Sequence, residues 1–274
     1  MKTKPNNPLV SVIIPAYNAE KYVAEAINSI LSQTYKNIEV VIIDDASTDG
    51  TLKIIQKYQL KDERIRLYSN EKNMGIGANR ARGIKLAKGE YICWQDADDI
   101  SLPNRIASQV SYLQGHPDVG VVGGFIQFFD ETGDGVIRRY EENDTALRSK
   151  IFRYNPIAQP ASMFRSDVYR NVGTYNPDYV VSEDLEMLFR AGTKYHFANI
   201  QEVVLKYRQT MNSLTRSSLR NMEKAALSLR MLYSKNSEYH FTVLDALYNI
   251  AQHISMILPL NLRMYIFRVV RGDK

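Results

Sequence analysis

Two clusters of acidic residues stand directly after apolar runs in the first hundred residues of this 274-residue chain. Asp44 and Asp45 follow the run 40–43, and Asp96-Ala97-Asp98-Asp99 follows the run 91–94. Neighbouring carboxylates repel one another, and a divalent cation such as Mg²⁺ or Mn²⁺ can neutralise them together with the phosphates of a substrate. The same residue types also start turns and cap helices. The acidic clusters alone therefore leave a metal–diphosphate site and ordinary turn chemistry as equal alternatives.

A third acidic pair, Glu183-Asp184, follows Ser182 and precedes the apolar pattern 185–191. Taken alone, this segment is better interpreted as a helix N-cap with acids at the positive end of the helix. A carboxylate held rigidly at the start of a helix could also act as a general base.

The acidic clusters need strands to position them, and the first half of the chain alternates strand and helix patterns. Apolar runs without charge predict buried strands, and apolar residues that repeat every three or four positions predict amphipathic helices. The predicted strands are 10–14, 40–43, 65–68 and 91–94, and the predicted helices are 23–31 (with Asn18 as N-cap), 52–58 and 76–87. The alternation predicts an α/β fold with a mostly parallel sheet, whose strand ends would bring the first two acidic clusters to one edge.

The second half of the chain is less regular. The patterns predict helices at 103–113 and 185–191, strands at 119–129, 162–164, 197–200 and 203–207, and a loop at 130–143. From about residue 217 only helical patterns remain.

The composition is that of an ordinary globular protein, with 45% hydrophobic and 24% charged residues. The single cysteine, Cys93, excludes an internal disulfide and a cysteine zinc site, and it fits a reducing, cytoplasmic compartment. The absence of a run of 18 apolar residues argues against a transmembrane helix.

The net charge of +5 is concentrated at one end of the chain. The sequence has 35 basic and 30 acidic residues, of which nine basic and four acidic residues lie in 216–274. The remainder is therefore neutral, with 26 of each sign. A neutral body argues against a nucleic-acid partner, and a basic, apolar end favours an anionic surface such as a membrane.

Four motifs resemble, in order and spacing, those of the inverting family 2 glycosyltransferases with the GT-A fold. They are Val10–Asn18, Ile42–Thr51, Asn73-Met74-Gly75 with Asn79 and Ala81, and Gly89–Ile92 leading to Asp96–Asp99. The resemblance covers roughly residues 9–215 and extends to bacterial enzymes of surface-polysaccharide and lipopolysaccharide assembly. It implies a GT-A catalytic domain over 1–215, with a nucleotide-binding half at about 1–100 and an acceptor half at about 101–215, followed by a helical extension over 216–274.

The resemblance implies a role for each matching residue. Asp184 would be the catalytic base, and Glu183 would orient it or contact a sugar hydroxyl. Asp98 would be the direct ligand of a Mn²⁺ or Mg²⁺ ion. The nucleotide would be bound by Pro15, Ala16, Tyr17, Asn18, Asp45, Asn79, Asp96 and Arg208.

The implied reaction is a metal-assisted single displacement that inverts configuration at the sugar. It would move a sugar from a nucleotide-diphospho-sugar, usually UDP-linked, to a hydroxyl of a saccharide or lipid-linked acceptor. The segment Asn155–Ser162 resembles the acceptor-side loop, although many relatives carry His where Gln159 stands. The alternative is a catalytically silent GT-A relative that acts as a nucleotide-sugar-binding or scaffold subunit.

The end of the chain gives rise to two further predictions. Apolar faces within 219–233 and 241–254 predict helices that pack on the catalytic domain, on each other or in a homodimer. In 261–271, Arg263, Arg268 and Arg271 share one side of a predicted helix, which is typical of an interfacial helix. We therefore predict peripheral membrane contact through 260–271, at the inner face of the cell membrane.

Overall fold

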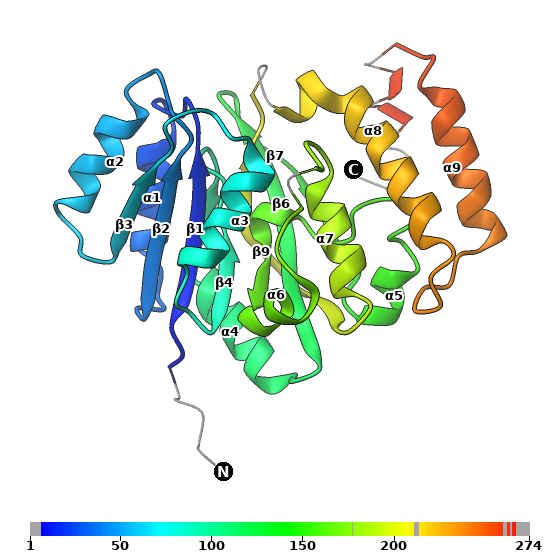
Figure 1. Cartoon of the computed structure of the whole chain (residues 1–274), viewed down its shortest axis with the longest axis horizontal. Helices are drawn as coiled ribbons and strands as arrows, with labels where there is room; N and C mark the ends of the chain where they lie inside the picture. Colours follow the sequence, from blue (N-terminus) through cyan, green and yellow to red (C-terminus); the bar gives the residue numbers. More distant parts are fainter. Residues whose placement is uncertain (1–6, 177, 211–213, 260–261, 264, 267–274) are drawn as a thin grey trace.

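The computed structural model describes residues 7–176, 178–210, 214–259, 262–263 and 265–266 (Figure 1). A nine-stranded sheet runs through the molecule in the order β3-β2-β1-β4-β8-β6-β9-β5, and β7 pairs with β6. The strands are β1 (Val10–Ala16), β2 (Ile38–Asp44), β3 (Ile65–Ser69), β4 (Tyr91–Trp94), β5 (Ile100–Ser101), β6 (Val119–Asp130), β7 (Gly133–Arg138), β8 (Met163–Arg165) and β9 (His196–Arg208).

The first four strands form a parallel block, as the alternating pattern predicts. β1 lies between β2 and β4, and β3 lies at the edge beyond β2. The antiparallel strand β8 joins this block to β6, which pairs in parallel with β9. In the register of β1 and β2, Ala16 lies opposite Asp44, so both strands end at the same level.

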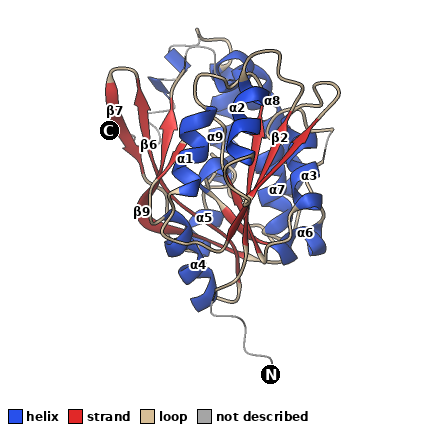
Figure 2. Cartoon of the chain, turned by 90° about the vertical axis from the view of Figure 1, so that its left-hand side faces the viewer, coloured by secondary structure: helices blue, strands red, loops and turns tan. Residues whose placement is uncertain are grey.

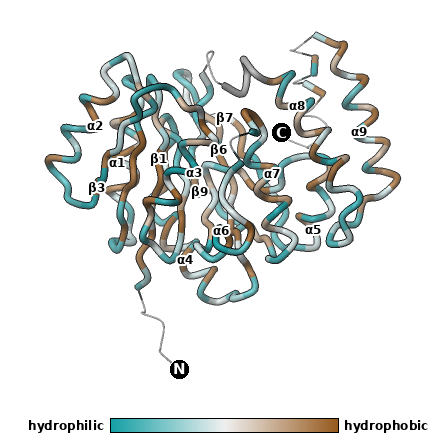
Figure 3. Tube along the Cα trace, viewed as in Figure 1, coloured by the Kyte–Doolittle hydropathy of each residue, from teal (hydrophilic) through white to brown (hydrophobic). Residues whose placement is uncertain are grey.

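Helices cover both faces of the sheet, which explains why the central strands β1 and β4 contain no charged residue (Figure 2). One core packs β1 residues such as Val12 and Ile14 against the helices α1 and α4, and the other packs Ile13 and Trp94 against α6 and α7. Figure 3 shows the parallel strands as largely hydrophobic along their length. The helices are α1 (Val23–Leu31), α2 (Thr51–Gln59), α3 (Ile76–Leu86), α4 (Arg105–Gly115), α5 (Asp144–Arg148), α6 (Ser166–Val172), α7 (Glu183–Ala191), α8 (Leu214–Tyr233) and α9 (Val243–Ser255), with a 3-10 turn at Gln159–Ala161.

Two local predictions need correction, and two short helices were not predicted. Asn18 is not a helix N-cap: α1 begins five residues later, and Asn18 has a left-handed backbone with φ 47°. The predicted loop 130–143 contains β7, which pairs with β6 across the Asp130–Gly133 turn, so that its polar residues lie on an exposed edge. The short helices α5 and α6 were missed because five and seven residues hold too few turns to show periodicity.

The two long C-terminal helices differ in which side they bury: α8 buries apolar residues, and α9 buries polar ones. On α8, Leu229 is buried and Tyr233 stacks on Phe189 of α7, so this helix packs on the catalytic domain as predicted. α9 packs beside α8 through polar residues such as Asn249, whereas Leu244 and Ile254 of its predicted apolar face are exposed to solvent. A homodimer through that face stays a prediction. Among the described helices, none has both the length and the hydrophobicity required to cross a bilayer.

Candidate active site

The loops that follow β1 and β2 are tied together at the carboxyl edge of the sheet. Pro15 and Ala16 end β1, and the backbone N–H of Asp45 donates to the Ala16 carbonyl at 2.8 Å. The side chain of Asn18 accepts from the backbone N–H of Thr48 at 2.8 Å, while its own N–H donates to the Ser47 hydroxyl at 3.0 Å. The left-handed turn at Asn18 therefore fixes one loop to the other.

Asp45 organises the segment that leads into α3. One carboxylate oxygen accepts from the Asn70 side chain at 2.6 Å and from the Met74 N–H at 2.8 Å, and the other accepts from the Gly75 N–H at 3.0 Å. The Asn79 amide donates to the Gly75 carbonyl and accepts from Asn70. Both predicted nucleotide-binding side chains thus shape a loop at the sheet edge, and both are almost fully buried.

The acids after β4 differ from one another in their surroundings. Asp96 and Asp98 are partly exposed, whereas Asp99 is buried. Burial and the charge of Asp96 raise the pKa of Asp98 to about 6. One Asp99 oxygen accepts from the Arg208 N–H at 2.8 Å, and the other is buried without a hydrogen-bond partner among the described residues. Burial raises the pKa of Asp99 well above its usual range.

Arg208 is held against these acids from the end of β9. Its Nε donates to the Asp98 carbonyl at 2.8 Å, its guanidinium contacts the Glu25 carboxylate, and the rings of Tyr22 and Phe129 lie on it. The residue is therefore close to the β4 acids, as a diphosphate ligand would require, and two of its side-chain nitrogens already donate to protein groups.

Glu183 and Asp184 begin α7. Ser182 precedes them with a left-handed backbone, φ 61°, and its hydroxyl donates to the Met222 carbonyl on α8 instead of capping α7. One Asp184 oxygen accepts from the Asn155 side chain at 2.8 Å, and the other accepts from the Leu185 N–H at 2.8 Å. Asn155 thus orients Asp184 from the predicted acceptor-side loop. In the same loop, Gln159 is buried and donates to the Tyr175 hydroxyl at 2.6 Å.

Arg80 of α3 joins the acids of α7 to those of β4. It forms an ion pair with Glu183, and its other terminal nitrogen lies 3.7 Å from Asp96. The guanidinium also lies over the rings of Trp94 and Tyr175, and its Nε finds no hydrogen-bond partner within the part of the chain that the structure describes. The sequence analysis did not identify Arg80 as a site residue. Its position directly after Asn79, in a helix that must pack on the sheet, could have indicated it.

The acids around Arg80 also interact with one another electrostatically. Burial raises the pKa of Glu183 to about 7; the positive charge of Arg80 opposes this shift and the negative charge of Asp184 adds to it. Burial also raises the pKa of Asp96, where Arg80 again opposes and Asp184 again contributes. The structure therefore brings Asp96, Glu183 and Asp184 within electrostatic reach of one another.

Comparison with known proteins identifies the family. Residues 11–173 match the model of glycosyl transferase family 2. An uncharacterized glycosyltransferase of Haemophilus influenzae is 34% identical over 229 residues, which is 80% of this chain and 70% of that protein. Another, from Methanocaldococcus jannaschii, is 32% identical over 209 residues, or 74% and 71% of the two chains. The chain belongs to glycosyltransferase family 2.

Solved structures confirm the fold of this glycosyltransferase. Staphylococcus aureus TarS 1–349 in complex with UDP-GlcNAc matches with a TM-score of 0.69 at 21% identity, over 92% of this chain and 76% of that one. The mannosyltransferase PcManGT of Pyrobaculum calidifontis, in complex with GDP-Man and Mn²⁺, matches with a TM-score of 0.64 at 17% identity, over 97% and 80%. The mixed α/β architecture is the GT-A fold that the motifs predict.

Proposed function

We propose that this glycosyltransferase moves a sugar from a nucleotide-diphospho-sugar to a hydroxyl of a saccharide or lipid-linked acceptor, with inversion of configuration. The observation that carries the proposal is the contact of Arg80 with both Glu183 and Asp96. This contact supports the proposal because Glu183, the neighbour of the predicted base Asp184, shares one arginine with Asp96, an acid at the strand end where a diphosphate would bind. UDP is the expected carrier, in line with the UDP-GlcNAc of the TarS complex.

The nucleotide would lie over the tied loops after β1 and β2. Pro15–Asn18 offer backbone groups there, and Tyr17 is half exposed. Asp45 would take the base, because carboxylate oxygens retain acceptor capacity beyond the three bonds that Asp45 makes within the loop. Asn79 would support this loop from behind, and Asp96 and Arg208 would flank the ribose and diphosphate.

A divalent cation fits the β4 acids. Asp96 and Asp98 present two partly exposed carboxylates whose mutual repulsion a cation would relieve. The described residues contain no group of three protein ligands for a metal. An arrangement with one or two carboxylates suits Mg²⁺ or Mn²⁺, which takes its remaining oxygens from substrate phosphates and water. Asp98 would hold the ion, which when bound would stabilise negative charge on the departing diphosphate.

The chemical step requires a base on the acceptor side. As the acceptor oxygen attacks the anomeric carbon, its proton would pass to an Asp184 carboxylate oxygen. The bond between the anomeric carbon and the diphosphate oxygen would break, and the nucleoside diphosphate would leave with the electron pair. Asn155 would keep Asp184 oriented, and Glu183 would remain in its ion pair with Arg80.

The expected setting is bacterial surface-polysaccharide assembly on the cytoplasmic side of the membrane. Of the predicted membrane segment 260–271, only 262–263 and 265–266 lie within the described residues. There, Arg263 is paired with Glu223 and so is not free to meet a lipid headgroup. The membrane contact of this segment and a homodimer both remain proposals.

Asp184→Asn tests the function. The variant keeps the size of the side chain but removes the base, so we expect UDP release from a UDP-sugar and acceptor to fall at least a hundredfold, in line with the typical contribution of general base catalysis. Asp178→Asn, in the exposed segment before α7, is the matched control and should retain wild-type activity.

Measuring UDP release from the wild type and from Asp184→Asn also distinguishes an enzyme from a catalytically silent subunit. A donor screen should cover UDP- and dTDP-sugars with and without Mn²⁺. If the wild-type chain binds UDP but releases none from any donor, the silent-subunit alternative holds. Equal turnover by wild type and Asp184→Asn would instead remove Asp184 as the base.

A further inference from the structure

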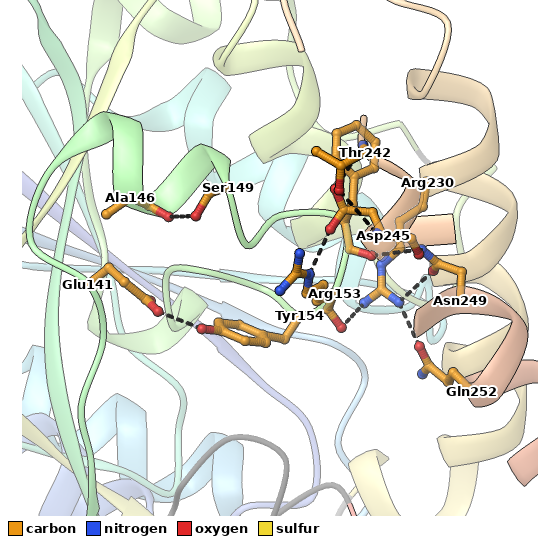
Figure 4. A network of polar contacts seen from close by, with 11 residues as sticks. Glu141, Ala146, Ser149, Arg153, Tyr154, Arg230, Thr242, Asp245, Asn249 and Gln252 are labelled. Atoms are coloured by element: carbon orange, nitrogen blue, oxygen red, sulfur yellow. Dashed lines mark hydrogen bonds and ion pairs between the residues drawn. The ribbon is translucent and has the colours of Figure 1, made fainter. Parts of the chain in front are cut away.

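The two residues that lead to Tyr154-Asn155 are held by the C-terminal helices (Figure 4). The Phe152 carbonyl accepts from the Asn249 side chain of α9 at 2.9 Å. The Arg153 carbonyl accepts from the guanidinium of Arg230 on α8 at 2.8 Å. Side chains of the C-terminal extension therefore fix the main chain of the catalytic domain just before the residue that orients Asp184.

The side chains that anchor this segment are polar, yet they are buried. Arg230 and Asn249 are 4% and 6% exposed. Arg230 also donates to Asn249 at 3.2 Å and to Gln252 at 2.7 Å, and the Arg153 side chain donates to Asp245 at 2.6 Å. The polar side of α9 thus faces the protein and meets this segment.

Arg230 is a buried cation whose hydrogen-bond acceptors are all neutral. Within the described part of the chain its guanidinium forms no ion pair, and burial lowers its pKa to about 10. Burying a charge in this way costs free energy, and apolar side chains would join two helices at lower cost. A planar guanidinium adds direction, because its donors fix the place of the carbonyl that they bind. The contact therefore serves position more than tight packing.

Asn155 transmits this position to Asp184. Its Oδ1 accepts from the Ile157 N–H at 3.4 Å, and its Nδ2 donates to Asp184 at 2.8 Å. The next carbonyl along the chain, that of Pro156, accepts from the Asn199 side chain of β9 at 3.1 Å. The main chain is thus held on both sides of Asn155, by the C-terminal helices before it and by β9 after it.

We propose that Arg230 and Asn249 are positioning residues for the base. Through the carbonyls that they bind, they set the place of Asn155 and so the direction of the Asp184 carboxylate. The inference rests on the proposed function of Asp184. It gives the C-terminal helices a part in the acceptor half of the site, whereas the loops after β1 and β2 are held by other contacts.

Hydrogen–deuterium exchange of the full chain without substrate tests the first link. Asn249→Ala removes one of the two anchors, and we expect the amides of 153–157 to exchange about threefold faster or more, because local opening becomes easier. The amides of 45–50, in the nucleotide-binding half, should exchange as in wild type. The matched control is Met256→Ala, which removes a buried apolar side chain at the end of the same helix and should leave 153–157 unchanged.

A double-mutant cycle tests the link to the base. Asn249→Ala and Arg230→Met should each lower kcat for UDP release about tenfold, because a misplaced base accepts the proton less well, and should leave the KM of the donor unchanged. In the Asn155→Ala background the same substitutions should lower kcat by less than about twofold more, since the connection to Asp184 is already lost. The donor is the most active one of the UDP- and dTDP-sugar screen. Urea denaturation verifies that each variant is folded.

Two results would overturn the proposal. One is wild-type exchange of 153–157 in both Asn249→Ala and Arg230→Met. The other is an equal fall in kcat in the wild-type and Asn155→Ala backgrounds, as a purely structural role of the two residues would produce. A wild-type chain that releases no UDP would remove the base and with it this role. Faster exchange in the variants would then show that the failure lies in the proposed function and not in the hold of the helices on the segment.

Discussion

Arg80 is the residue on which the geometry of the acidic cluster depends. It is 6% exposed and faces carboxylates from two elements that are about 90 residues apart in sequence. Without its charge, Asp96, Glu183 and Asp184 would repel one another in a partly dry site. Arginine suits this position because its planar group can meet two carboxylates and two aromatic faces at once.

Replacing Arg80 tests this role. Arg80→Gln removes the positive guanidinium group that lies between the acids. We expect kcat to fall at least a hundredfold. We expect the free energy of unfolding to fall by about 3 kcal/mol, the lower end of the range for breaking a buried ion pair. Arg80→Lys keeps the charge but not the planar fork, and should recover part of both losses. Steady-state kinetics and chemical denaturation measure the two effects. Lys85→Gln, exposed on the same helix, should change neither. Unchanged turnover in Arg80→Gln would contradict the role.

At the scale of elements, α8 is an integral part of the catalytic body rather than an appended tail. It supplies Leu229 to the core beneath α7, and its Met222 carbonyl accepts from Ser182, one residue before the Glu183-Asp184 pair. The extension therefore helps to position the start of α7.

Leu229→Ala should show this integration as a loss of stability. Removing a buried leucine side chain leaves a cavity, and we expect the free energy of unfolding to fall by about 2–5 kcal/mol. Urea denaturation of the full chain measures the change. The matched control is Met231→Ala, two residues along the same helix but 57% exposed, for which we expect less than about 0.5 kcal/mol. Similar small losses in both variants would mean that α8 is only loosely attached.

At the scale of the whole molecule, the free energy of unfolding should fall as the pH rises and the acidic cluster ionises. The pKa of Glu183 is raised to about 7 from an ordinary value of 4.5, so between these pH values the folded chain binds a proton that the unfolded chain has released. Stability contributed by this group is therefore present below about pH 4.5 and is lost as the pH rises through 7. The raised pKa of Asp98, about 6, acts in the same direction.

A comparison of wild type with Glu183→Gln isolates this effect, because the amide does not titrate. We expect the stability of wild type relative to Glu183→Gln to decline between pH 4.5 and 7.5, as measured by urea denaturation without added metal. Glu71→Gln, which removes an exposed carboxylate away from the acidic cluster, serves as the control for the loss of one negative charge. A relative stability of Glu183→Gln that does not change over this range would show that Glu183 titrates normally.

The sequence alone determined the parallel half of the sheet and the positions of its acids. Uncharged strands and helix periodicity are local signals, and they placed β1, β2, β3 and β4 within a few residues of their observed bounds. The motifs then led to family 2 and the GT-A fold, which the family match and the solved relatives bear out. The roles assigned to the individual site residues remain predictions.

Only the tertiary structure decided which side of each element is buried. An apolar stripe normally predicts a buried face, yet on α9 the hydrogen bonds of Arg153 and Arg230 to Asp245 and Asn249 turn the stripe outward. Likewise, nothing local to Arg80 indicates that Glu183, 103 residues away, will meet it. Periodicity records which residues share a face, but the partner of that face is set by long-range contacts, and a one-dimensional pattern does not contain them.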